Sequence, residues 1–209
     1  MDWNHPEHVF GSGLEPVILR VLWRAGAPMT GAEVHRVAGK GSVGGIRLAL
    51  SRLALQGIVL SSRVGMAATH TLNREHLGFP AVDAAFSALD PWTQFRSRVT
   101  EVMTEHSPDD PLSVTVAVFG SVARDEARLD SDVDLAVVVA EVDERAQNLA
   151  DELREELGAA TGQAVQVYLT TPARLRDAVH QGDPIVDSFR SDARAVSGPD
   201  IRTYLQEHR

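Results

Sequence analysis

The chain has 209 residues and a formal net charge of −9 at pH 7, and it contains no cysteine. The lack of cysteine excludes a disulfide framework and a thiolate site. No apolar run approaches the roughly 18 residues that span a bilayer, and no signal peptide opens the chain, so a cytoplasmic protein is expected. The eight histidines are scattered without zinc-ligand spacing. The length suits one large or two small domains.

The charge is unevenly distributed along the chain. Through Gly78 there are eight Lys or Arg against five Asp or Glu, whereas the remainder has twelve against twenty-four. This division suggests two domains, with contact to nucleic acid only through the mildly basic first one.

The first third of the chain predicts helices followed by a hairpin. Residues 1–13 are polar and predict a loose leader. Apolar residues at helical spacing then predict three helices, over residues 16–25, 30–38 and 42–56. Thr30 with Glu33 has the pattern of a capping box. Two short strands, residues 58–63 and 68–72, are expected to join around Gly65. Val37 and Val43 are expected on the buried stripes of the second and third helices.

This order of elements resembles a winged-helix DNA-binding domain, which we assign to residues 1–78. The resemblance implies that the third helix enters the major groove of double-stranded DNA while the hairpin touches its backbone. The residues expected to contact DNA are polar and lie off the apolar stripe, at the helix entry or on the hairpin: Lys40, Ser42, Arg47, Ser51, Arg52 and Arg63. The alternative is that these are ordinary surface residues of a domain used for dimerisation or partner binding.

The most informative stretch of the chain is residues 119–139. A buried strand over residues 114–118 ends at Gly120-Ser121, and a second strand begins at Asp132. Because strand side chains alternate between faces, Asp132 and Asp134 point the same way. Two such carboxylates beside a Gly-Ser turn can hold a hard divalent cation against a phosphate chain, although Asp-x-Asp alone is most often a solvated acidic pair.

Gly120-Ser121, followed after ten residues by Asp132-x-Asp134, resembles the signature of the DNA polymerase β-like nucleotidyltransferase superfamily, and in particular its minimal nucleotidyltransferase branch. The resemblance implies that Gly120 and Ser121 contact a nucleoside triphosphate, and that Asp132 and Asp134 are catalytic ligands of Mg²⁺ or Mn²⁺. Arg124 is placed to orient the phosphates. A solvated arginine, or a salt bridge to Asp125 or Glu126, is the alternative for Arg124. The branch usually has Gly where this chain has Asp125, a difference that would alter the loop.

A third carboxylate is usual on a later strand of active superfamily members. The matching strand here is residues 164–169, where Gln166 stands in the position of that acid. An amide ligates a metal weakly and is no general base at neutral pH. Either catalysis is impaired or another acid takes this role, so the substitution places the transfer activity in question, though not nucleotide binding.

The fold class we expect is α/β (α+β), with the winged helix followed by a helical connector over residues 79–110 and a small mixed-sheet nucleotidyltransferase domain over residues 111–209. The expected function is transfer of an NMP group from an NTP to an acceptor hydroxyl, coupled to DNA binding. The alternative is a DNA-binding transcriptional regulator whose nucleotidyltransferase domain senses a nucleotide without turnover. A small helical toxin–antitoxin partner and a homodimer are the protein partners left open.

Overall fold

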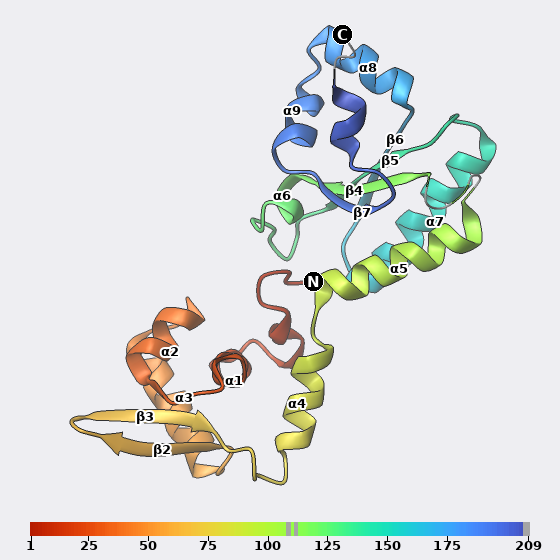
Figure 1. The fold of residues 1–209 in the computed structure, drawn as a ribbon. Coiled ribbons are helices and arrows are strands. Elements are labelled where there is room, and N and C mark those ends of the chain that lie inside the picture. The colour runs from red at the N-terminus through yellow and green to blue at the C-terminus, as the bar shows by residue number, and fades with distance from the viewer. Residues whose placement is uncertain (108–109, 111–112, 207–209) are drawn as a thin grey trace. The chain divides into compact units, whose positions relative to one another are not determined.

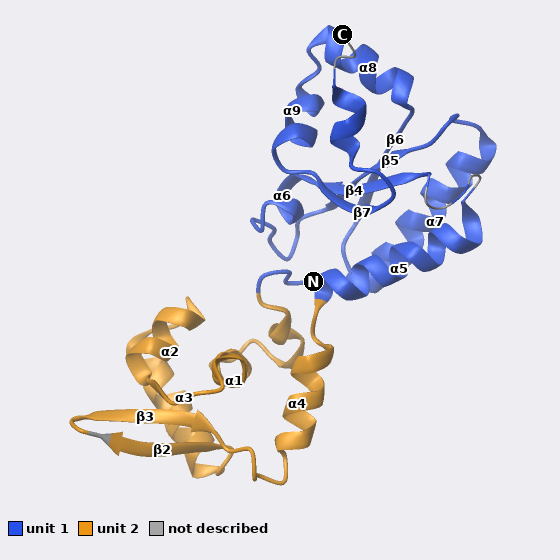
Figure 2. Ribbon diagram, viewed as in Figure 1, with its two compact units in different colours: residues 1–4, 91–209 blue, residues 5–90 orange. Residues whose placement is uncertain are grey.

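The computed structural model describes residues 1–107, 110 and 113–206, and the chain divides into two units (Figures 1 and 2). Unit 1 comprises residues 1–4 and 91–209, and unit 2 comprises residues 5–90. The region predicted as a helical connector, residues 79–110, is thus shared between the units. Within the described residues, no helix is long and apolar enough to cross a membrane.

In unit 2, three α-helices precede a β-hairpin along the chain and a fourth follows it. In chain order its elements are η1 (Pro6–Phe10), α1 (Leu14–Ala25), β1 (Met29–Thr30), α2 (Gly31–Ala38), α3 (Val43–Leu55), β2 (Val59–Val64), β3 (Ala67–Leu72) and α4 (Phe79–Ala88). The strands form an antiparallel sheet in the order β1-β3-β2. The three helices and the hairpin predicted from the sequence are confirmed, with Gly65 at the hairpin turn in the left-handed region (φ 62°).

Side-chain caps fix where two of these helices begin. Thr30 accepts a hydrogen bond from the Glu33 amide, and the Glu33 carboxylate accepts one from the Thr30 amide, which confirms the capping box. Ser42 caps α3 in the same way, by accepting from the Gly45 amide at 3.1 Å. Each cap satisfies amides that the first helical turn leaves without a partner.

Three expectations for the N-terminal region are wrong. Val37 and Val43 are 54% and 62% exposed, because the core contacts of α2 run through Val34 and Ala38 and those of α3 begin only at Ile46. Residues 1–13 are not a loose leader. Trp3 is 6% exposed and packs in the core of unit 1, and Pro6–Phe10 form η1 of unit 2.

Unit 1 is built around one mixed sheet. Its elements are α5 (Pro91–His106), β4 (Thr115–Phe119), α6 (Gly120–Ala123), β5 (Val133–Val138), α7 (Glu144–Thr161), β6 (Val165–Thr170), α8 (Pro172–Gln181), α9 (Pro184–Ser191), β7 (Arg194–Ser197) and η2 (Ile201–Leu205). The strand order is β6-β5-β4-β7, with β5 and β6 parallel and the other pairs antiparallel. The expected small mixed sheet is confirmed. The short 3-10 helix η2 follows β7, and residues 207–209 lie outside the described part.

Both faces of this sheet are covered. Helices α5 and α7 pack on one face, where Met103, Leu149 and Leu153 join the core. Elements α8, α9 and η2 contribute Leu175, Phe189 and Ile201 to the core on the other face. Strand β5 lies between β6 and β4 and is buried from Leu135 to Val138, so its N-terminal end is where polar side chains can reach the surface.

Candidate active site

The two predicted metal ligands lie where strand β5 begins. Asp132 is exposed just before the strand, and Asp134 is half-buried within it. Asp134 pairs in register with Phe119 at the end of β4 on one side and with Gln166 of β6 on the other. The sheet therefore brings the Gly-Ser turn, the Asp-x-Asp pair and Gln166 to the same place.

Gly120 is in direct contact with the Asp134 carboxylate. Its φ of +73° is in the left-handed region, which glycine adopts without penalty. A Cβ atom added there would lie 2.4 Å from Asp134 Oδ2. Glycine accommodates both the positive φ and the close approach at this position, and the group that approaches is Asp134.

The electrostatics of the pair favour an added positive charge. Burial raises the pKa of Asp134 above its usual value, the negative charge of Asp132 raises it further, and the charge of Arg124 opposes both effects. Two adjacent carboxylates, one of them partly desolvated, are stabilised in their ionised form by a cation between them. This is the property expected of a divalent-metal site.

Gln166 extends the pair on the neighbouring strand. Its side-chain amide lies 3.4 Å from Asp132 Oδ2, at the long end of hydrogen-bond distance, and its side chain is exposed. The amide donates to the carboxylate and adds no negative charge. The site thus has two carboxylates and one amide on adjacent strands.

Arg124 follows the short helix α6 and is held by two carboxylates. Its Nε donates to Glu126 Oε2 at 2.8 Å, and its Nη1 donates to Asp192 Oδ2. These hydrogen bonds, that to Glu126 first, raise the pKa of Arg124 above its usual value, so the side chain remains a cation. Of the two salt bridges considered for Arg124 from the sequence, the one to Glu126 is present.

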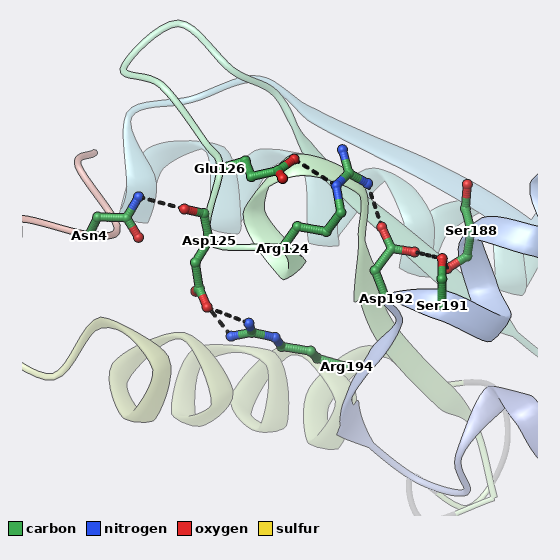
Figure 3. A network of polar contacts seen from close by, with 8 residues as sticks. All are labelled: Asn4, Arg124, Asp125, Glu126, Ser188, Ser191, Asp192 and Arg194. Atoms are coloured by element: carbon green, nitrogen blue, oxygen red, sulfur yellow. Dashed lines mark hydrogen bonds and ion pairs between the residues drawn. The ribbon is translucent and has the colours of Figure 1, made fainter.

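Sequence reasoning missed the contacts that hold the turn after α6 (Figure 3). Asp125 forms a forked ion pair with Arg194, with N–O distances of 2.6 and 3.2 Å. Asn4 donates to the Asp125 carbonyl at 2.8 Å, and Asp192 binds Arg124. The sequence offers one local signal for this arrangement, which is an aspartate at a position where the resembled branch has glycine.

Gln163 supports the next part of the same loop. Its side-chain amide donates to the carbonyls of Ser131 at 2.9 Å and of Arg128 at 3.2 Å. Its own oxygen accepts a 2.8 Å hydrogen bond from the indole of Trp3. A buried glutamine with these three bonds fixes the backbone directly before Asp132.

Most of the predicted DNA contacts already have partners inside unit 2. Ser42 is engaged as the cap of α3, and the Ser51 hydroxyl donates to the Arg47 carbonyl at 2.9 Å. Arg52 forms an ion pair with Glu15, with Nε 2.8 Å from the carboxylate oxygen. These contacts leave the side chain of Arg47 as the free cation of α3 in the described chain.

Lys40 and Arg63 complete the predicted set. The Lys40 ammonium lies 2.9 Å from His8 Nε2, whereas Arg63 is exposed on β2 without an ion pair to any described residue. Helix α3 also exposes apolar side chains beside Arg47, since Leu48 is 59% exposed. The predicted surface therefore has two free arginines, at positions 47 and 63.

A second cluster of potential metal ligands was not expected from the spacing of the histidines. Ligand atoms of His5, Glu7 and His8 lie within 4.8 Å of one another. However, Glu7 is already paired with Arg20, and Lys40 contacts His8. Two cations in direct contact with the ligand atoms oppose a divalent ion there, so this cluster is better explained as part of the packing of η1 on α1.

The comparisons with known proteins concern unit 1. The family model of the nucleotidyltransferase domain matches residues 97–195. Two similar solved structures are a crystal structure of a toxin-antitoxin with AMP-PNP and a tri-AMPylated Shewanella oneidensis HEPN toxin in complex with MNT antitoxin. The first is 16% identical with a TM-score of 0.35, and covers 53% of this chain and 80% of that one. The second is also 16% identical, with a TM-score of 0.33, and covers 55% and 80%.

At these TM-scores the structural likenesses are too weak to carry an argument about this chain. No curated protein matches the sequence. The family match includes the Gly-Ser turn, the Asp-x-Asp pair, Gln166 and Arg194. Residues 97–195 of this chain are therefore similar to the nucleotidyltransferase domain family.

Proposed function

We propose that unit 1 transfers a nucleoside monophosphate group from an NTP to an acceptor hydroxyl and releases pyrophosphate, with Mg²⁺ or Mn²⁺ held by Asp132 and Asp134. The observation that carries the proposal is the contact between Gly120 and Asp134, which joins the two halves of the motif in one site. The raised pKa of Asp134 supports a cation there, because the pair of acids gains from added positive charge.

The charge of the unit also supports a metal. Unit 1 has twelve Lys or Arg and twenty-three Asp or Glu, so an NTP would approach a surface of its own sign. Carboxylate oxygens are the ligands Mg²⁺ takes in phosphate sites, and it keeps several positions for water and phosphate. When bound, the metal would supply stabilisation of the charge that develops on phosphate oxygens.

The residues of the chain would position the reactants. Gly120 admits the Asp134 carboxylate against its backbone, and Ser121 offers a hydroxyl next to it in the chain for contact with a phosphate. Arg124 supplies a fixed cation whose charge already acts on Asp134. Gln166 orients Asp132 through its amide rather than acting as a base. The acceptor hydroxyl would then have to lose its proton to one of the two aspartates.

The test is a labelling assay with each of the four α-³²P NTPs, with Mg²⁺ or Mn²⁺ and with cell lysate as the source of acceptor. We expect the wild type to transfer label and the Asp132→Ala/Asp134→Ala double variant to transfer none. The labelled species would identify the acceptor, including a partner protein if one exists. Equal labelling by the double variant would remove Asp132 and Asp134 from the mechanism.

A specific observation favours the alternative of a nucleotide-sensing regulator. Arg124 already binds two carboxylates, and Gln166 replaces the usual third acid, so both groups are less suited to turnover than to holding a ligand. The same assay separates the two functions. Nucleotide binding by the wild type without transfer to any acceptor would favour the regulator.

We further propose that unit 2 is a winged helix that binds double-stranded DNA through α3 and the β2–β3 hairpin. The order of its elements and the free, exposed Arg47 and Arg63 support this. The residues that already have partners, such as Arg52 with Glu15, would contribute less. The homodimer and the helical partner protein remain predictions.

The DNA proposal predicts a salt-dependent mobility shift that depends on two arginines. Counterion release lowers log K by roughly 0.9 per log salt for each phosphate contact, so Arg47→Ala/Arg63→Ala should reduce the slope by about 2. Arg24→Ala, an exposed arginine of the same unit on α1, is the matched control and should bind as the wild type. The absence of any shift at low salt would rule out the proposal.

A further inference from the structure

Two ion pairs of opposite polarity join the turn after α6 to residues 192–194, where α9 has ended and β7 begins (Figure 3). The turn presents a cation and then an anion, Arg124 and Asp125. The facing segment presents an anion and then a cation, Asp192 and Arg194. Arg124 binds Asp192, and Asp125 binds Arg194. A shift of one residue along the turn would bring Asp125 against Asp192, so the order of charges specifies a single alignment.

The facing segment is rigidly attached to the sheet. Arg194 pairs in register with Val118 of β4, which ends at the Gly-Ser turn. The residue between the two charges, Ala193, is buried in the core below α9. The Arg194 guanidinium also lies 5.2 Å from the ring centre of Trp92, a cation–π distance. The groups that hold the turn are therefore themselves held by packing.

The turn needs this support because of Asp125. It has a φ of 59°, and within the described residues it is the one residue other than glycine with positive φ. The left-handed conformation carries a steric cost for a residue with a Cβ atom, which aspartate tolerates better than most. The fork to Arg194 and the hydrogen bond from Asn4 act on the side chain and the carbonyl of this same residue.

Asp192 is the second fixed point. Its side chain is 5% exposed, so its carboxylate needs a partner, and Arg124 is the cation that pairs with it. Arg124 is in turn tied to the Gly-Ser turn, because its amide donates to the Gly120 carbonyl at 3.1 Å, and Gly120 lies against the Asp134 carboxylate. The position of Asp192 thus sets where the positive charge of Arg124 stands relative to the two aspartates.

We infer that Asp192 and Arg194 form a clamp that positions the phosphate-binding turn, with Asp125 as its counterpart on the turn. This inference rests on the proposed function of unit 1. Asp125, Asp192 and Arg194 are positioning residues, which act on the nucleotide through the turn and through Arg124. Loss of the clamp should weaken NTP binding while leaving the fold of the unit in place.

The decisive variant is Asp125→Gly, which removes the ion pair but makes the backbone conformation easier. We expect its melting temperature to be unchanged or higher, while the Kd for MgNTP measured by calorimetry rises about tenfold, as for a group displaced from its productive position. Arg194→Met should weaken binding by a similar factor. Arg98→Met, which removes an exposed pair with Glu101 and Glu156 on the α5–α7 face, should bind NTP normally.

The hydrogen-exchange rates of the amides of residues 121–126 measure the order of the turn in the absence of nucleotide. We expect faster exchange in Asp125→Gly and Arg194→Met than in the wild type or Arg98→Met. Failure of the wild type to bind any NTP would defeat the proposed function, and exchange would still decide whether the clamp orders the turn. Wild-type exchange rates and wild-type NTP affinity in Asp125→Gly would overturn the clamp.

Discussion

Asp134→Asn should reduce nucleotidyl transfer by roughly 10³-fold, about 4 kcal/mol of transition-state stabilisation, without destabilising the fold. The asparagine keeps the shape of the side chain beside Gly120 but halves the charge of the proposed metal site. Because the pKa of Asp134 is raised by burial and by Asp132, its ionisation opposes folding, and removing the charge relieves that cost. Activity and stability are therefore expected to change independently.

The raised pKa of Asp134 determines whether the free energy of unfolding rises or falls with pH. A folded-state pKa above the unfolded value means that the folded protein binds more protons in the window between them, so the wild type loses stability as pH rises through this window. Below both values the carboxyl is neutral in both states. Asp134→Asn should match the wild type at that acidic end and gain on it as pH rises, which urea unfolding at several pH values without metal would measure.

Asp130→Asn is the matched control, since Asp130 is an exposed carboxylate in the same loop. It should transfer label at the wild-type rate. Full activity of Asp134→Asn would show that this carboxylate is not a metal ligand. A large loss of stability at neutral pH would show instead that the ionised carboxylate supports the fold.

Gly120→Ala should cost both stability and function, and for separable reasons. The left-handed backbone at this position costs a residue with a Cβ about 1–2 kcal/mol. The added methyl group would also meet Asp134 Oδ2 at 2.4 Å, so the carboxylate must move. We expect affinity for MgNTP and the rate of transfer to fall together, by roughly 100-fold, because a displacement of the order of 1 Å has that effect on a positioned group.

Gly162→Ala isolates the backbone contribution. Gly162 ends α7 with a φ of +68°, and nothing lies within 4 Å of a Cβ added there. It should lose stability by a similar amount in thermal unfolding and retain full nucleotide affinity. Equal loss of affinity in the two variants would mean that general destabilisation, rather than the displacement of Asp134, explains the effect at Gly120.

The parts of the fold that sequence patterns predicted are those fixed by neighbours along the chain. The cap of α2 by Thr30 and Glu33 requires two residues three apart, and the shared face of Asp132 and Asp134 follows from strand alternation. The close contact of Gly120 with Asp134 could be expected because the two strands it joins are consecutive. The motif and its local geometry could therefore be predicted from the sequence.

The parts that could not be predicted depend on partners far apart in the sequence. Arg124 and Asp192 are 68 residues apart, and Trp3 and Gln163 are 160 apart. Arg124 meets Asp192 because the fold places the residues before β7 beside the turn after α6. Trp3 meets Gln163 because Trp3 packs in the core of unit 1 near the start of β6. Neither pairing can be predicted from a local sequence pattern. At Val43 the local pattern predicted burial that the fold does not provide. The apolar spacing of α3 begins at Val43, whereas the buried part of the helix begins only at Ile46.

The burial of Trp3 limits how unit 1 can be exchanged between proteins as a module. Trp3 packs against Trp92 and Phe95, with ring centres 5.1 and 5.4 Å away, and its indole bonds to Gln163. Its burial is worth about 3–5 kcal/mol by comparison with buried tryptophans replaced by alanine. Cutting the chain after Asp90 and removing the N-terminal part would leave a cavity where Trp3 packs against Trp92 and Phe95. Gln163, which holds the loop before Asp132, would also lose its hydrogen bond from the Trp3 indole. Transplanting only the C-terminal segment would therefore yield a weakened domain, because unit 1 is built from two separate stretches of sequence.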